Sequence, residues 1–202
     1  MSTDDPERSG AELLTPIDFQ SPGRFALDIP AAIARTSGKP PPPNRELQRF
    51  ESAIEARRHL DVLLQHARRN LSLYSQDFEP WLYDDEAVEQ ACSCLLRSNP
   101  RCRFRVLLRD SSRAVRQGHR LLRLARRLTS QFQIRLLHPD YQVSTTAFVL
   151  VDAGGALACP EPGAFAGYAL YHDPGRVRQL QQQFDSAWDH SLSDPELRSF
   201  LL

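Results

Sequence analysis

The chain has 202 residues, of which 41% are hydrophobic and 25% charged, and its 25 basic and 25 acidic side chains give a formal net charge of zero. This composition is typical of a soluble globular protein, and the balanced charge gives no overall field that attracts nucleic acid or an anionic membrane. The single lysine is Lys39, so a domain that begins after residue 45 has no lysine for a Schiff base or a phosphate-binding loop.

The first 44 residues predict a disordered or loosely docked tail. Prolines are frequent there, four of them in succession at 40–43, and the scattered serines, glycines and acids leave little apolar surface for a core. The acidic start lacks the apolar run of a signal peptide. The longest strongly apolar run, 147–151, is too short to span a bilayer. We therefore expect a cytoplasmic protein without membrane contact.

Residues 45–202 carry the patterns of one α/β domain. Apolar residues from Phe50 to Leu64 recur at helical spacing and predict a helix over 46–68. The patterns that follow predict a strand at 70–74, an irregular connection at 77–83, a helix at 84–96, a strand at 104–108, a helix at 112–128, strands at 133–137, 146–151, 156–159 and 167–170, and a helix from 174. This order predicts a single sandwich in which helices flank a mixed β-sheet.

The four cysteines predict reduced thiols. They are Cys92, Cys94, Cys102 and Cys159, a low density for a chain without a signal peptide. Cys92, Cys94 and Cys102 are three potential metal ligands, but residues two apart on the predicted helix point in different directions. We expect no metal site there.

Two short runs carry a resemblance to a known fold. In 148–155 a strand runs into a hairpin that contains aspartate, and 184–191 resembles the end helix of the same fold. With the element order, these runs make residues 65–192 resemble one half of a phospholipase D-like fold. More narrowly, the chain resembles an uncharacterised bacterial domain that in relatives follows a GNAT-type acetyltransferase domain. The resemblance implies a phospholipase D-like α/β domain over 45–202.

The catalytic residues of that superfamily are missing at the matching positions. Its active members carry His-x-Lys-x4-Asp, in which the histidine attacks phosphorus and the lysine binds the phosphoryl oxygens. Counting back from Asp152 puts Thr145 at the histidine position and Ala147 at the lysine position. Asp152 alone is better explained as a hairpin residue. The resemblance therefore implies a degenerate site and no phosphodiesterase chemistry.

An arginine stripe is the most prominent charged feature of the predicted helix over 112–128. At about 100° per residue, five arginines fall within an arc of roughly 80°, opposite the apolar face. They are Arg113, Arg116, Arg120, Arg123 and Arg127. Aligned guanidinium groups can hold phosphates or an acidic partner. The alternative, which we favour, is a solvated face whose side-chain stems cover apolar surface.

The ends of the predicted strands supply a second set of candidate residues, because ligands of open α/β sheets collect there. The set comprises Ser75, Asp77, Arg109, Asp110, His138 and Asp140. Ser75, His138 and Asp110 are a candidate nucleophile, base and orienting acid, although no nucleophile elbow surrounds Ser75. The three aspartates are candidate Mg²⁺ ligands. Helix caps and loop acids are the interpretation that we favour.

These observations predict a non-catalytic binding, regulatory or protein-interaction module without a cofactor. Its partner is expected to be a protein or a small anionic ligand. Zero net charge and the lack of aromatic residues within a basic groove argue against nucleic acid. One alternative is a hydrolase that uses His138 with Asp77 or Asp110. Another, suggested only by the resemblance, is an accessory domain of an acetyltransferase system.

Overall fold

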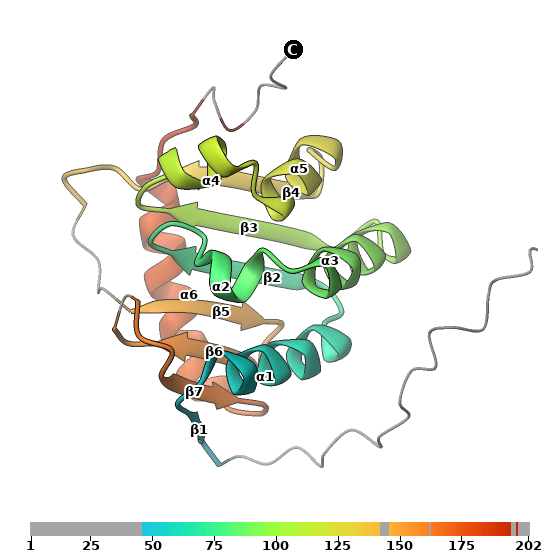
Figure 1. Cartoon of the computed structure of the whole chain (residues 1–202), viewed down its shortest axis with the longest axis vertical. Coiled ribbons are helices and arrows are strands. Elements are labelled where there is room, and N and C mark those ends of the chain that lie inside the picture. The colour runs from blue at the N-terminus through green and yellow to red at the C-terminus, as the bar shows by residue number, and fades with distance from the viewer. Residues whose placement is uncertain (1–45, 142–145, 162, 195–196, 198–202) are drawn as a thin grey trace, which may run out of the picture. The chain divides into compact units, whose positions relative to one another are not determined.

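The computed structural model describes residues 46–141, 146–161, 163–194 and 197, so the predicted tail lies outside the described residues. Seven strands form one sheet in the order β1-β7-β6-β5-β2-β3-β4, with helices on both faces (Figure 1). This architecture confirms the predicted fold class. Within the described part of the chain, no helix has both the length and the apolar character that a membrane crossing requires.

The sheet has a parallel and an antiparallel half. β2 (Asn70–Ser75), β3 (Arg103–Leu108) and β4 (Phe132–Leu136) are parallel neighbours. β5 (Ala147–Val151), β6 (Gly155–Cys159), β7 (Gly167–Leu170) and β1 (Gln48–Phe50) are antiparallel neighbours. The two halves join where β5 pairs antiparallel with β2. The carboxyl end of the sheet therefore holds the ends of β2 to β4, the start of β5 and the end of β6, and the amino end holds the β5–β6 turn.

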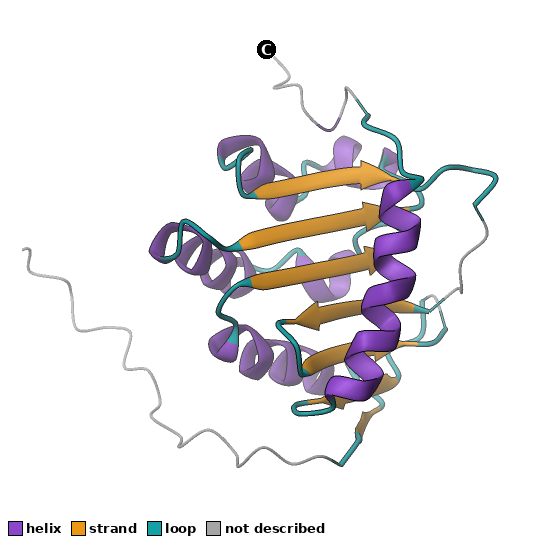
Figure 2. Cartoon of the chain, turned by 180° about the vertical axis from the view of Figure 1, so that it is seen from behind, coloured by secondary structure: helices purple, strands orange, loops and turns teal. Residues whose placement is uncertain are grey.

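Helices form a layer on each face. One face carries α1 (Ala53–His66), α2 (Pro80–Tyr83), α3 (Glu86–Ser98), α4 (Ser112–Gln117) and α5 (Arg120–Arg127). α6 (Pro174–Asp189) crosses the other face (Figure 2). Alternate strand residues point to the two layers: Leu73 and Val149 belong to the core under α1 to α5, and Tyr74 and Phe148 to the core under α6. Because β5 and β6 are buried on both faces, both strands are apolar throughout.

The predicted helix over 46–68 is wrong at its start, where the chain forms the edge strand β1. Ser52 begins α1, since its hydroxyl accepts a hydrogen bond from the Glu55 N–H at 3.3 Å. Before this cap, β1 pairs with β7, and Phe50 lies opposite Gly167. A Cβ on Gly167 would come within 2.6 Å of the Phe50 ring. The formation of β1 thus depends on its pairing with β7, which lies more than a hundred residues further along the chain.

The predicted helix over 112–128 is also wrong, because it is interrupted after Gln117. Gly118 adopts the left-handed conformation, with φ of 63°, and ends α4. His119 then begins α5, and its Nδ1 accepts a hydrogen bond from the Leu121 N–H at 3.2 Å. The predicted irregular connection at 77–83 contains one short helix, α2. The arginine stripe is therefore divided between two helices.

Candidate functional site

Three side chains from separate strands form a buried row at the carboxyl end of the sheet. Ala147, the first residue of β5, pairs directly with Cys159, the last residue of β6. The pairing of Tyr74 with Phe148 puts Ser75, the last residue of β2, on the other side of Ala147. Exposure is 0% for Ser75, 7% for Ala147 and 5% for Cys159. We call these three residues the buried row.

Glu79 has a buried carboxyl group that contacts Ser75 of the buried row. Its Oε2 accepts a hydrogen bond from the Ser75 hydroxyl at 2.5 Å, and its Oε1 accepts one from the Gln76 N–H at 3.2 Å. Burial raises the pKa of Glu79 to about 7, although these two hydrogen bonds lower it. Burial, followed by the charge of Glu79, raises the pKa of the Cys159 thiol to about 12. The thiol therefore stays protonated and is a poor nucleophile.

A strained turn places Glu79 there. Phe78 and Glu79 have positive φ angles of 71° and 25°, a conformation that costs residues with side chains about 1–3 kcal/mol each. The Ser75 hydroxyl stabilises the turn, because it accepts a hydrogen bond from the Phe78 N–H at 2.7 Å. The Phe78 ring stacks on His119 with a centroid distance of 4.5 Å. The turn is thus held between β2 and the start of α5.

His119 is a buried imidazole at this end of the sheet, with 1% exposure. Burial lowers its pKa, which favours the neutral form of the ring. Its Nδ1 is the acceptor that caps α5, and its Nε2 has no hydrogen-bond partner in the described part of the chain. Sequence analysis did not single out His119 or Glu79. The Gly118-His119 and Glu79-Pro80 pairs were the available signals, since both mark interruptions of regular structure.

The two described residues of the degenerate motif lie at opposite ends of the sheet. Ala147 lies in the buried row and offers a methyl group. Asp152 lies in the β5–β6 turn with φ of 50°, and its carboxylate accepts hydrogen bonds from the N–H groups of Arg68, Arg69 and Asn70 at 2.7, 2.8 and 2.9 Å. Asp152 thus joins this turn to the α1–β2 connection. Thr145 lies outside the described residues.

The candidate triad has no internal hydrogen bond in the described structure. Ser75 donates to Glu79 instead. Asp110 accepts a hydrogen bond from the Ser112 N–H at 2.8 Å, and hydrogen bonds from the side chain and then the backbone of Ser112 lower its pKa. The Nδ1 of His138 accepts one from the Asp140 N–H at 3.2 Å. These are the contacts of loop acids and caps.

The candidate Mg²⁺ ligands have similar local contacts. Asp77 forms an ion pair with Arg113 at 2.8 Å, whereas the Asp140 carboxylate is exposed and lies 3.7 Å from His138. Across residues 46–141, 146–161 and 163–194, no three His, Cys, Asp or Glu side chains are grouped as metal ligands. Arg109 contributes a backbone N–H to the Ser75 carbonyl and has an exposed side chain.

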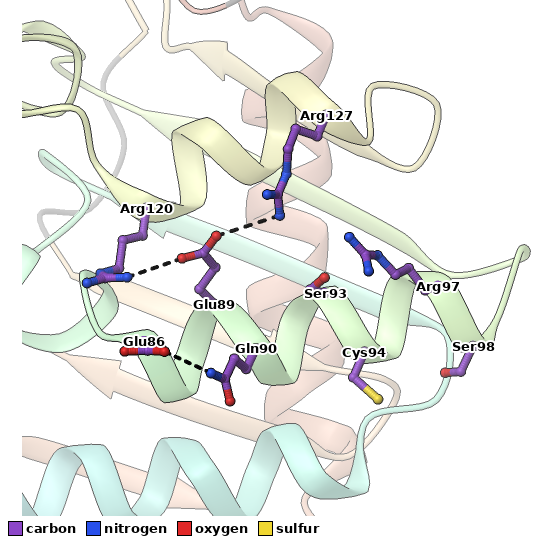
Figure 3. A pocket seen from close by; sticks show the side chains of 9 residues that line it. All are labelled: Glu86, Glu89, Gln90, Ser93, Cys94, Arg97, Ser98, Arg120 and Arg127. Carbon is purple, nitrogen blue, oxygen red and sulfur yellow. Dashed lines mark hydrogen bonds and ion pairs between the residues drawn. The ribbon is translucent and has the colours of Figure 1, made fainter. Parts of the chain in front are cut away.

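A groove of about 720 Å³ between α3 and α5 contains two arginines of the predicted stripe. In Figure 3, Arg120 and Arg127 point from α5 to Glu89 on α3, at 3.5 and 3.7 Å. Arg97 also lines the groove, and no dashed line joins it to another residue drawn. One carboxylate thus neutralises part of the charge of two arginines and connects the helices.

The other three arginines of the stripe lie elsewhere. Arg113 pairs with Asp77, and Arg123 donates to the Gly118 carbonyl at 2.9 Å. Arg116 is exposed at the end of α4. The five arginines therefore do not form one continuous stripe, because the break at Gly118 changes the direction of the chain between the two groups.

Residues 52–200 match a family model described as "Domain of unknown function (DUF7931)". The chain belongs to this family. A search of curated proteins gave no match. The family model by itself does not show the predicted link to acetyltransferases, which stays a prediction.

Solved structures share the fold at low sequence identity. TrmBL2, an archaeal chromatin protein with a novel mode of DNA binding, has a TM-score of 0.55 and 13% identity over 76% of this chain and 55% of that chain. NucT from Helicobacter pylori has a TM-score of 0.50 and 9% identity, covering 74% of this chain and 99% of NucT. Nuc from Salmonella typhimurium, a phospholipase D family member, has 0.50 and 7%, covering 72% of this chain and 94% of Nuc.

These likenesses show the fold alone. They confirm that the described domain has a phospholipase D-like fold, as the resemblance implied. The domain corresponds to nearly the whole of Nuc and NucT but spans about half the length of TrmBL2.

Proposed function

We propose that this chain is a non-catalytic binding module with a phospholipase D-like fold. The observation that carries the proposal is the buried row. At the position that the family resemblance assigns to the phosphoryl-binding lysine, Ala147 lies between Ser75 and Cys159, with the Glu79 carboxyl close to Ser75 and Cys159.

Phosphodiester cleavage requires a nucleophile and a positive charge that stabilises the developing negative charge. The buried row supplies a methyl group, a hydroxyl bound to Glu79 and a thiol with a pKa of about 12. None of the three side chains is more than 7% exposed. Ionised Glu79 would in addition repel a phosphate. These features argue against phosphodiester cleavage at the buried row.

A turnover assay and a binding assay on the full chain test the proposal together. We expect no hydrolysis of bis(p-nitrophenyl) phosphate above the uncatalysed background. In a thermal-shift panel of nucleotides, phosphosugars, polyanions and acyl-CoA, we expect at least one stabilising ligand at sub-millimolar concentration. Hydrolysis that disappears in Ser75→Ala contradicts the non-catalytic assignment. Hydrolysis that disappears in His138→Ala supports the hydrolase alternative instead. A panel without any stabilising compound contradicts the binding role.

A further inference from the structure

A second groove lies at the amino end of the sheet, away from the buried row. It has a volume of about 800 Å³ and is bordered by the start of β2, the β5–β6 turn and α6. Figure 2 shows that α6 crosses near the carboxyl ends of β2 to β4, so that no helix of the described residues covers the amino-terminal parts of these strands on this face. We call this site the amino-end groove. Its charged lining residues are Arg68, Arg69, Arg105, Arg178, Asp152 and Asp185.

Both acids of the amino-end groove are already engaged. The Asp152 carboxylate accepts three backbone hydrogen bonds from the α1–β2 connection. Asp185 pairs with Arg105 at 2.7 Å and accepts a hydrogen bond from the Gln181 amide at 3.0 Å. Arg105 in turn lies over the Phe184 ring, with its guanidinium carbon 5.0 Å from the ring centroid.

Three guanidinium groups in the groove have no such partner. Within the described residues, the side chains of Arg68, Arg69 and Arg178 make no hydrogen bond or ion pair, and all three residues are exposed. Four arginines against two aspartates leave a charge of +2 in the lining. Like charges that share one groove repel each other, so an anion that enters relieves this repulsion.

The backbone that carries these arginines is held in place. Asp152 binds the N–H groups of Arg68 and Arg69, and the carbonyl of Arg68 accepts a hydrogen bond from the Asn99 amide at 2.6 Å. Arg178 follows the buried Val177 on α6. A fixed backbone lowers the entropy lost when a ligand binds. Asp152, the described polar residue of the degenerate motif, is therefore a positioning residue for this groove.

We propose that the amino-end groove binds a phosphorylated small molecule that carries at least two negative charges, an inference that rests on the proposed binding function. Guanidinium groups donate two parallel hydrogen bonds to phosphoryl oxygens, which suits arginine better than lysine for this ligand. A volume of about 800 Å³ lies in the range of small-molecule sites. Double-stranded nucleic acid requires an extended basic surface, and the groove is confined between α6 and one turn.

Calorimetric titration of the full chain with inorganic pyrophosphate and with ADP tests the proposal. The wild type should bind at least one of them with a sub-millimolar dissociation constant. Arg178→Ala, and separately Arg68→Ala with Arg69→Ala, should weaken binding by about tenfold or more. Arg176→Ala is the matched control, because Arg176 lies on the same helix, contacts Gln179 and does not line the groove. It should bind as the wild type does.

The melting temperature without ligand separates a lost ligand contact from a lost fold. Because Arg178 has no partner among the described side chains, Arg178→Ala should melt at the wild-type temperature or above it, while losing the ligand-induced shift. Equal binding by all variants overturns the groove assignment and leaves the binding function intact. Absence of binding to both compounds at about 5 mM overturns the assignment too.

Two further outcomes separate the remaining possibilities. Tighter binding of duplex DNA, lost in the same arginine variants, overturns the small-molecule class in favour of nucleic acid. Hydrolysis of ADP or pyrophosphate that is lost in Arg178→Ala contradicts the proposed non-catalytic function, while it retains the groove as the ligand site.

Discussion

Replacement of Glu79 with glutamine tests whether an ionisable carboxyl closes the carboxyl end of the sheet. Glutamine keeps the shape, and its oxygen can accept from the Gln76 N–H. Its amide can donate to the Ser75 hydroxyl, which donates to Glu79 in the wild type and must turn its own proton away from residue 79 in the variant. Glutamine does not titrate. Burial raises the pKa of Glu79 from 4.5 to about 7. Between these two pH values, Glu79 keeps its proton in the folded chain but has released it in the unfolded chain.

The size and sign of the effect follow from this difference. The two pKa values, 4.5 and about 7, differ by an amount that corresponds to about 3 kcal/mol at about 1.4 kcal/mol per pKa unit. Between these two pKa values the folded state binds more protons, so the free energy of unfolding falls as the pH rises. The stabilisation from protonated Glu79 is fully present below pH 4.5 and is lost as the pH rises through about 7. Glu79→Gln should therefore gain about 3 kcal/mol relative to the wild type between about pH 4.5 and 8.

Urea unfolding followed by tryptophan fluorescence at several pH values measures this gain. Glu86→Gln is the control, because Glu86 is an exposed carboxylate on α3 that contacts Gln90. It should follow the pH dependence of the wild type. Parallel stability curves for the wild type and Glu79→Gln would refute the reasoning, since Glu79 then has the same pKa in both states.

Three further predictions concern other contacts. Gly118→Ala should lower the free energy of unfolding by about 1 kcal/mol because the φ angle of Gly118 is 63°, whereas Gly175→Ala in the first turn of α6 should raise it by about 0.5–1 kcal/mol. Thermal melts that show a change of the same sign for both variants would contradict this prediction. Asp152→Ala should lower the free energy of unfolding, measured with urea, by about 2–3 kcal/mol. Asp152→Asn should lower it less, since asparagine keeps one acceptor and tolerates a positive φ angle; the reverse order would contradict the turn assignment. Glu89→Gln should lower the free energy of unfolding by about 1 kcal/mol or less, and by a smaller amount at high salt, because Arg120 and Arg127 are partly exposed. A loss of stability that salt does not reduce would contradict a screened ion pair.

Patterns within short segments were sufficient for the fold class and for most elements. Apolar runs indicated β5 and β6, and the intervening Asp152 and glycines indicated their hairpin. These signals are local, because a strand buried on both faces needs an apolar side chain at every position. The prediction that Ala147 takes the lysine position was likewise local, since counting back from Asp152 reaches Ala147 within one segment.

Contacts between distant segments decided the rest. β1 forms because Gly167 leaves room for Phe50, and Glu79 has a raised pKa because the surrounding strands and helices exclude water from it. The amino-end groove brings Arg68 beside Arg178, which lies more than a hundred residues further along the chain. The sequence by itself determined the fold class, and it predicted that Thr145 and Ala147 replace the catalytic pair of the resembling superfamily. Only the tertiary structure decided which carboxyl is buried and which arginines share a groove, because burial and charge proximity depend on residues that no local pattern connects.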